Sequence, residues 1–192
     1  GKRILHTLSG LGNNKAITAF IAVICFLMAA NLNAQTLDWV KTFGGIGYDI
    51  GNSVTVDDEG NIYTTGSFND TVDFDPGVDS MKLSAENDAD IFIQKLDANG
   101  NFLWAKSFGR NNDDAGFSIK VDAMGNIYAT GIFGDTVDFD PGMEEHFITT
   151  KNRSIFILKL DNSGNYRWVK SMNSSVSSQG WGRSIGVDSK GS

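Results

Sequence analysis

The sequence has few of the residues on which common enzyme chemistry depends. It contains one cysteine, two prolines and two histidines among 192 residues. The cysteine, Cys25, lies in a predicted signal peptide, so the mature chain would have no thiol, no disulfide and no cysteine metal ligand. His146 is the one histidine after that segment. It lies in an acidic connection without an evident partner for acid–base catalysis, and we interpret it as a solvated loop residue.

Basic residues are also scarce beyond position 34. The formal net charge is −7, and the segment 1–34 holds three basic residues and no acid, so the remainder has a formal charge of −10. Nucleic acid and anionic membrane surfaces are bound by clustered Lys and Arg. The composition therefore argues against both as partners.

A long apolar run is missing as well. The most apolar stretch, Ala16–Ala30, is shorter than the roughly 20 residues that a helix needs to cross a bilayer. It follows basic residues and precedes a small residue at Ala34, which is typical of a cleaved signal peptide over 1–34. We expect a secreted or cell-surface protein without a membrane span after cleavage. A retained anchor or a buried helix is the alternative.

Repetition is what the sequence has in abundance. The stretch Gly60–Gly77, GNIYTTGSFNDTVDFDPG, recurs 65 residues later as Gly125–Gly142, GNIYATGIFGDTVDFDPG, with three differences. Trp39, Trp104 and Trp168 mark another segment that occurs three times at about the same spacing. A fixed period of this length indicates a repeat architecture.

Each repeat unit reads as two β-hairpins. In Asn52–Phe68 and in Asp90–Gly109, β-branched and apolar residues alternate with polar ones around a turn of the form D-x-x-G. A longer connection, Asn69–Asp90, joins the two hairpins and is centred on Asp75-Pro76-Gly77. The tryptophans at fixed repeat positions are interpreted as core residues.

Four strands in two hairpins, repeated every 65 residues or so, predict an all-β fold of four-stranded antiparallel β-propeller blades. One blade cannot cover both of its faces, so it stacks on its neighbours and a ring closes. A parallel β-solenoid and a sandwich are less consistent with so long and so faithful a repeat.

The domain plan follows from the repeat. We expect a signal peptide over 1–34, an N-terminal strand and loop over 35–51, blade repeats over 52–115 and 116–182, and the start of a third over 183–192. This is a fragment of about two full blades plus partial ones, whose partners would include further blades of the same chain. Leu37–Gly45 is predicted to be the last strand of a preceding blade, which in a ring could complete the final blade.

Three motifs resemble the secreted bacterial β-propeller repeat (SBBP) family, in a variety that contains DFDPG. They are W-x-K-x-F-G at Trp39–Gly44, S-[VI]-x-V-D-x-x-G-N-I-Y-x-T-G at Ser53–Gly66, and D-F-D-P-G at Asp73–Gly77, each with a second copy. The resemblance implies an exported propeller, commonly part of a large surface or secreted bacterial protein. It transfers no catalytic residue.

The DFDPG loops offer the strongest candidates for a metal site. Asp73 and Asp75, with Asp138 and Asp140 in the second copy, could supply oxygens to Ca²⁺. The alternative is a turn in which Pro sets φ, Gly takes a positive φ and the Asp side chain accepts from a backbone N–H. The sequence predicts no other cofactor.

The function expected from these features is a non-enzymatic scaffold, adhesion or binding module with a protein or glycan ligand. A repeat places the same residues in every blade, whereas catalysis needs a unique cluster. One alternative is a Ca²⁺-dependent glycan-binding propeller. Another is a quinoprotein-like dehydrogenase, because Asp97, Gly100 and Trp104 resemble the blade-docking pattern of those enzymes. Trp181, between two glycines, is the tryptophan most suited to an exposed contact.

Overall fold

The computed structural model describes residues 38–140, 142–172 and 180–188. The chain divides into two units, Gly1–Asp38 and Trp39–Ser192, and every strand described below lies in the second. Throughout the described ranges no residue is helical, and no helix there could cross a membrane. The predicted signal peptide, 1–34, lies outside the described residues.

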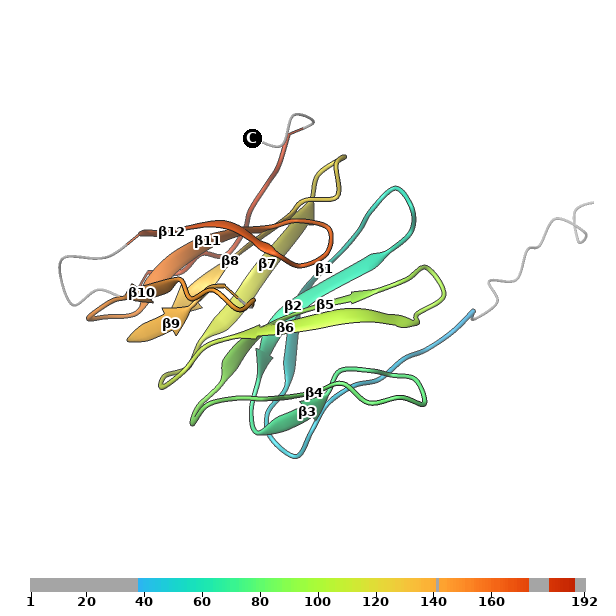
Figure 1. Ribbon diagram of the computed structural model, residues 1–192, viewed down its shortest axis with the longest axis horizontal. Helices are drawn as coiled ribbons and strands as arrows, with labels where there is room; N and C mark the ends of the chain where they lie inside the picture. The colour runs from blue at the N-terminus through green and yellow to red at the C-terminus, as the bar shows by residue number, and fades with distance from the viewer. Residues whose placement is uncertain (1–37, 141, 173–179, 189–192) are drawn as a thin grey trace, which may run out of the picture. The chain divides into compact units, whose positions relative to one another are not determined.

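Six strands form the first repeat. They are β1 (Ile50–Val56), β2 (Ile62–Phe68), β3 (Thr71–Asp73), β4 (Lys82–Ser84), β5 (Asp90–Leu96) and β6 (Phe102–Phe108). The long strands form an antiparallel sheet in the order β1-β2-β5-β6, and β3 pairs with β4 beside it (Figure 1). The two predicted hairpins, β1–β2 and β5–β6, are confirmed.

The second repeat has the same plan. Its strands are β7 (Ala115–Val121), β8 (Ile127–Phe133), β9 (Thr136–Asp138), β10 (Phe147–Thr149), β11 (Ser154–Leu160) and β12 (Tyr166–Met172). The four long strands pair in the order β7-β8-β11-β12, and β9 pairs with β10. The short hairpins β3–β4 and β9–β10 lie within connections that the sequence predicted as loops.

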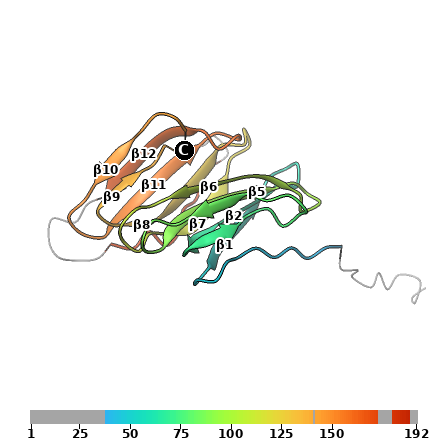
Figure 2. The same cartoon turned by 60° about the horizontal axis from the view of Figure 1, so that its bottom comes forward.

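The sheets of the two repeats share one apolar core. Strands β1, β2 and β5 of the first repeat contact β7 of the second, and the two sheets lie side by side in both views (Figures 1 and 2). Tyr63, Ile91 and Ile93 from one repeat are fully buried in the same cluster as Ile119 and Phe156 from the other. Each repeat therefore covers part of its apolar surface with its neighbour, as the repeat pattern predicts.

A second cluster fills the far side of the first repeat. Phe68, Phe74 and Phe92 are its buried aromatic residues, and Phe43 packs against them. The ring of Phe43 lies 5.4 Å from that of Phe74 and 5.6 Å from that of Phe92. Phe108, at the end of β6 of the first repeat, takes the corresponding place on the second repeat, where it stacks on Phe139.

The segment predicted as an N-terminal strand, Leu37–Gly45, differs from expectation. Residues 38–49 form no strand, and an isolated bridge joins Gly44 to Asp73. The prediction assigned this segment to another blade, and both four-stranded sheets are complete without it, so the segment has no strand partner along its length among the described residues. Phe43 of this segment nevertheless packs on the first repeat in the way that Phe108, at the end of β6, packs on the second repeat.

Candidate functional site

The first strand of each repeat contains a β-bulge at the same place. The register shifts between Gly51 and Ser53 in β1, and between Gly116 and Ser118 in β7. The extra residue is Asn52 in the first repeat and Phe117 in the second. Bulges redirect side chains and are common near functional sites.

The third repeat begins in the same way. Ile185 donates its backbone N–H to Ser118 Oγ at 3.3 Å, just as Ile119 donates to Ser53 Oγ at 3.3 Å one repeat earlier. Arg183 is therefore the third residue of a series whose first two members are Asn52 and Phe117. In all three copies a glycine precedes it and a serine follows it.

These equivalent residues surround one pocket. Asn52, Phe117, Trp181 and Arg183 line a cavity of about 210 Å³. The rings of Phe117 and Trp181 stack at 5.7 Å with an angle of 26° between their planes. The guanidinium groups of Arg183 and Arg153 lie 5.4 and 5.9 Å from the Trp181 ring, within cation–π range. Trp181 remains 45% exposed.

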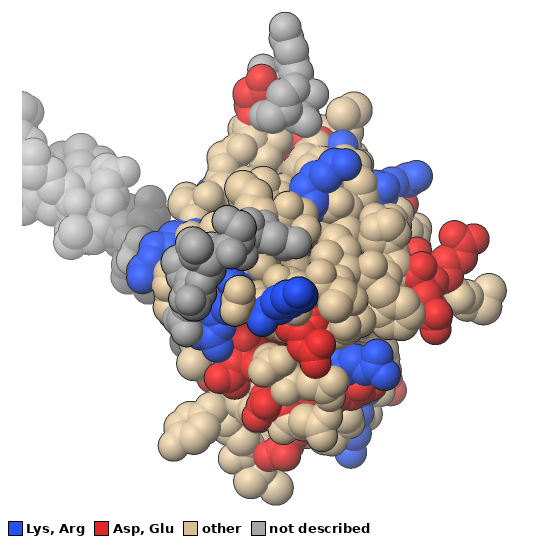
Figure 3. Space-filling view, turned by 90° about the vertical axis from the view of Figure 1, so that its left-hand side faces the viewer, with Lys and Arg blue, Asp and Glu red and all other residues tan. Residues whose placement is uncertain are grey.

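Basic charge is locally enriched there, although the chain as a whole is acidic. Arg153 pairs with Asp113 at 3.7 Å, whereas Arg183 forms no ion pair within the described ranges. No acidic residue lines the pocket. On the face that Figure 3 shows, acidic and basic side chains are interspersed without a broad patch of one sign.

The carboxylates of the DFDPG loops are engaged in local hydrogen bonds. Asp73 Oδ1 accepts from the N–H of Met81 at 2.9 Å, and Asp75 Oδ1 accepts from the N–H of Gly77 at 2.7 Å. In the second repeat Asp138 accepts from His146 N at 2.7 Å and Asp140 from Gly142 N at 2.8 Å. Such bonds are those of a turn, but the predicted positive φ of the glycine is wrong, because neither Gly77 nor Gly142 has one.

The structure does not bring a larger set of metal ligands to these loops. Within the described residues no group of three or more His, Cys, Asp or Glu side chains could hold a metal ion. The buried member of the motif is its phenylalanine, because Phe74 and Phe139 have no exposed surface. The sequence reasoning overlooked these two residues, although an aromatic residue amid repeated acids was a signal that one position faces inward.

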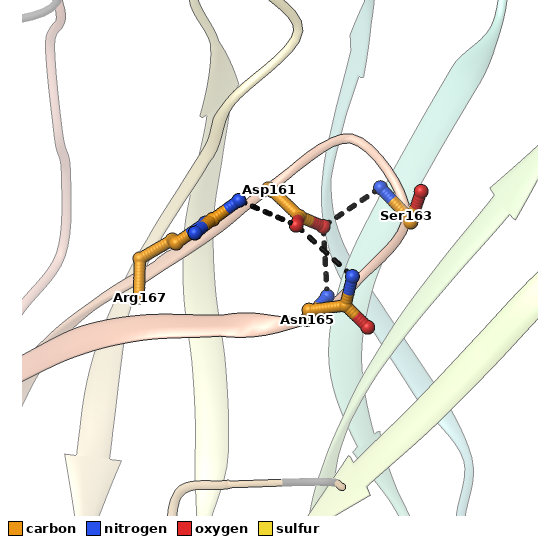
Figure 4. Close-up of polar contacts among 4 residues, drawn as sticks. All are labelled: Asp161, Ser163, Asn165 and Arg167. Atoms are coloured by element: carbon orange, nitrogen blue, oxygen red, sulfur yellow. Dashed lines mark hydrogen bonds and ion pairs between the residues drawn. The ribbon is translucent and has the colours of Figure 1, made fainter.

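The D-x-x-G-N segments close the hairpins by a shared set of bonds. Asp161 Oδ1 accepts from the N–H groups of Ser163 and Asn165, both at 2.9 Å, and Oδ2 accepts from Asn165 Nδ2 and Arg167, both at 3.0 Å (Figure 4). Partial burial alone would raise the pKa of the Asp161 carboxyl. The hydrogen bonds outweigh this effect and lower the pKa below its ordinary value. The equivalent residues are Asp57, Asp97 and Asp122. Turn chemistry, as predicted, accounts for these acids.

Tryptophan joins one repeat to the next. Trp104 of β6 donates its indole N–H to the carbonyl of Asn162 at 3.3 Å, and its ring lies against Gly164. Trp39 makes the same bond to Ala98 at 3.3 Å and lies against Gly100. These turn glycines take a positive φ and leave room for the ring. The Asp-Gly-Trp pattern that resembled a quinoprotein thus has a structural role.

Two comparisons with known proteins agree with this architecture. Residues 38–69 match the SBBP family, described as a beta-propeller repeat. The four-stranded sheets are β-propeller blades. The chain is also 28% identical over 155 residues to an uncharacterized WD repeat-containing protein, L264, of Acanthamoeba polyphaga mimivirus. This similarity covers 68% of the chain and 11% of that relative, so the chain spans only a small part of the relative's length.

Proposed function

We propose that this chain is part of an exported, non-enzymatic β-propeller protein that acts as a scaffold, adhesion or binding module outside the cell. The apolar run before Ala34 supports export. The similarity to propeller repeats supports a binding or scaffold role. Fold similarity alone does not specify a ligand.

The observation that carries the proposal is the division between constant and variable residues. The repeated Asp, Gly, Phe and Trp residues close turns, fill the core or dock one blade on the next. The bulge positions Asn52, Phe117 and Arg183 instead differ in size and charge and line a pocket. A constant scaffold that presents variable side chains is how repeat proteins make binding surfaces.

Export is tested by fusing 1–34 to a reporter enzyme that is active only outside the bacterial cytoplasm. We expect active reporter, and mass spectrometry of the exported full chain should show an N-terminus at Gln35. The matched control carries acidic substitutions at Ile21 and Val23, which should abolish export. An inactive fusion, or an uncleaved chain, would contradict the proposal.

The non-enzymatic assignment is tested with the purified chain on a panel of glycans and peptides. We expect binding without turnover, because the repeated carboxylates already accept hydrogen bonds within turns. Product formation that increases with the concentration of the purified chain would overturn this part of the proposal. Calorimetry with Ca²⁺ tests the Ca²⁺-dependent alternative at Asp73, Asp75, Asp138 and Asp140, and we expect no heat of binding.

A further inference from the structure

The bulge residue is the variable centre of an otherwise constant motif. The three copies read Gly51-Asn52-Ser53, Gly116-Phe117-Ser118 and Gly182-Arg183-Ser184. The serines have a common task, since Ser53 and Ser118 each accept a backbone N–H from the following repeat. In the second and third copies the glycine has a steric role, because a Cβ at Gly116 would collide with Thr65 and a Cβ at Gly182 would collide with Thr130, whereas a Cβ at Gly51 would meet only an ordinary contact. Packing between repeats therefore constrains the residues on either side of Phe117 and Arg183 and leaves the central side chain free to vary.

The pocket between these side chains combines an aromatic surface with one uncompensated positive charge. Phe117 supports Trp181 from one side by stacking, so the exposed indole is held in place. Arg183 has no ion pair among the described residues and adjoins the same ring. Asn52 donates through Nδ2 to the carbonyl of Gly116 at 2.9 Å, and its Oδ1 accepts no hydrogen bond from the described part of the chain.

The geometry disfavours an extended peptide as the ligand. A peptide that adds to a sheet needs free backbone groups along an edge strand. At this edge the Gly116 carbonyl already accepts from Asn52, and the N–H of Ile119 already donates to Ser53. The N–H of Ile185 is likewise bonded to Ser118. The strand edge beside the pocket is thus closed by side chains of the neighbouring blades.

The charge of the chain and the size of the cavity further restrict the class of ligand. A polyanion would be repelled by a chain with a net charge of −7, whereas a single carboxylate can be held by one guanidinium. The cavity of about 210 Å³ accommodates one ring rather than a long ligand. A sugar ring offers an apolar face to an indole, hydroxyl groups to an amide oxygen and, when oxidised, a carboxylate to an arginine.

We propose that Asn52, Phe117, Trp181 and Arg183 form a binding site for a single carboxylated sugar residue, a uronic acid. The exposed surface of Trp181 contacts the sugar ring, Arg183 binds the carboxylate through two N–H groups, and Asn52 Oδ1 accepts a hydrogen bond from a hydroxyl group. This inference rests on the proposed binding function and gives it a site and a ligand class.

The test is an NMR titration of the full chain labelled with ¹⁵N. Four tryptophans give four indole N–H signals, and only Trp181 is in the pocket. The probes are methyl glucuronide, the neutral methyl glucoside and a short peptide with a free C-terminal carboxylate. We expect glucuronide to shift the Trp181 signal and to bind at least about tenfold more tightly than the glucoside, because the glucoside lacks the charge-assisted bonds.

Matched variants separate the contributions of the individual residues to sugar binding. Arg183→Gln should weaken glucuronide binding about tenfold and leave glucoside binding unchanged. Arg167→Gln, which alters an arginine paired with Asp161 in a hairpin turn, should change neither. Phe117→Asn introduces the residue that the first repeat carries at this position, so the chain should fold, and it should weaken both sugars by removing the support of Trp181. Unchanged amide spectra outside the pocket confirm folding.

Three results would overturn the inference. They are equal affinity for glucuronide and glucoside, shifts of Trp39 or Trp104 in place of Trp181, and binding of the peptide alone. None of them bears on export or on the lack of turnover. Failure of this site therefore remains distinguishable from failure of the proposed function.

Discussion

Two buried carboxylates at the boundary between the blades predict that stability decreases as the pH rises. Asp90 begins β5 and Asp114 directly precedes β7, and the two side chains are 3% and 1% exposed. The N–H of Asp114 donates to the carbonyl of Ala89 at 2.8 Å, so the two acids are adjacent. Asp90 Oδ1 and Asp114 Oδ2 have no hydrogen-bond partner within the described residues.

The environment favours the neutral acids. Burial raises the pKa of Asp90 to about 6. Burial also raises the pKa of Asp114 to about 7, and the charge of Asp90 adds to that effect, while the N–H of Gly134 at 2.8 Å opposes it. A protonated Asp114 can donate where an ionised one cannot, which suits two neighbouring acids with unpaired oxygens.

The direction of the pH effect follows from linkage. In the unfolded chain both groups ionise near their ordinary value of 3.8. Between about pH 4 and pH 7 the folded chain therefore binds more protons than the unfolded one, and the free energy of unfolding decreases as pH rises through this window. A shift of about two pKa units at Asp90 corresponds to about 3 kcal/mol.

The perturbation is Asp114→Asn. The amide keeps an oxygen for the N–H of Gly134 and replaces the ionisable oxygen by a donor next to Asp90. The shift of about three pKa units at Asp114 corresponds to about 4 kcal/mol, so we expect the variant to gain about that much over the natural chain at pH 8 and to match it near pH 4. Asp90→Ser should also reduce the dependence of the free energy of unfolding on pH. This variant should fold, because the second repeat carries a buried serine, Ser154, at the equivalent position.

The assay is urea denaturation followed by tryptophan fluorescence at pH 4.5, 6 and 8. Asp58→Asn is the matched control, because Asp58 is exposed, and its curve should run parallel to that of the natural chain. The reasoning is refuted if the natural chain becomes more stable from pH 4.5 to pH 8. It is also refuted if Asp114→Asn shows the same pH dependence as the natural chain.

Three further predictions concern the contacts that build and join the blades. Trp104→Ala should lower the free energy of unfolding by about 3 kcal/mol, and Trp168→Ala by less than half of that, because no described turn receives the Trp168 indole; urea midpoints distinguish them. Gly131→Ala should cost more than about 3 kcal/mol, since its Cβ would collide with a backbone oxygen of β7, and loss of the folded circular-dichroism spectrum is the readout. Phe139→Ala should cost about 4 kcal/mol and the exposed Phe147→Ala less than about 1 kcal/mol, so similar melting temperatures would contradict the assigned core.

The long strands could be predicted because the hairpins are periodic and end in turns with a recognisable chemistry. Val54 and Val56 alternate with polar residues before a D-x-x-G turn, and the structure places both in β1. Strands β3 and β4 could not be found in this way, because three residues are too few to show a period of two. Their pairing brings together Thr71 and Ser84 across a loop without a turn signature.

The candidate site was less accessible to sequence reasoning. Trp181 was singled out because it interrupts the repeat, and the structure shows it half exposed beside Phe117. The bulge in β1 could not be predicted, since one extra residue in a largely exposed strand does not disturb any apolar pattern. The burial of Asp90 and Asp114 could not be predicted from the sequence, because only the arrangement of neighbouring blades buries them.

The tryptophan contact between blades has a consequence for how such genes change. Trp104 fits the turn at Gly164 as Trp39 fits the turn at Gly100, so each junction has the same two halves. Duplication or deletion of one whole period by recombination leaves every junction matched, whereas a break inside a period leaves a mismatched one. Related genes can therefore gain or lose whole blades without changes in the sequence of the remaining blades.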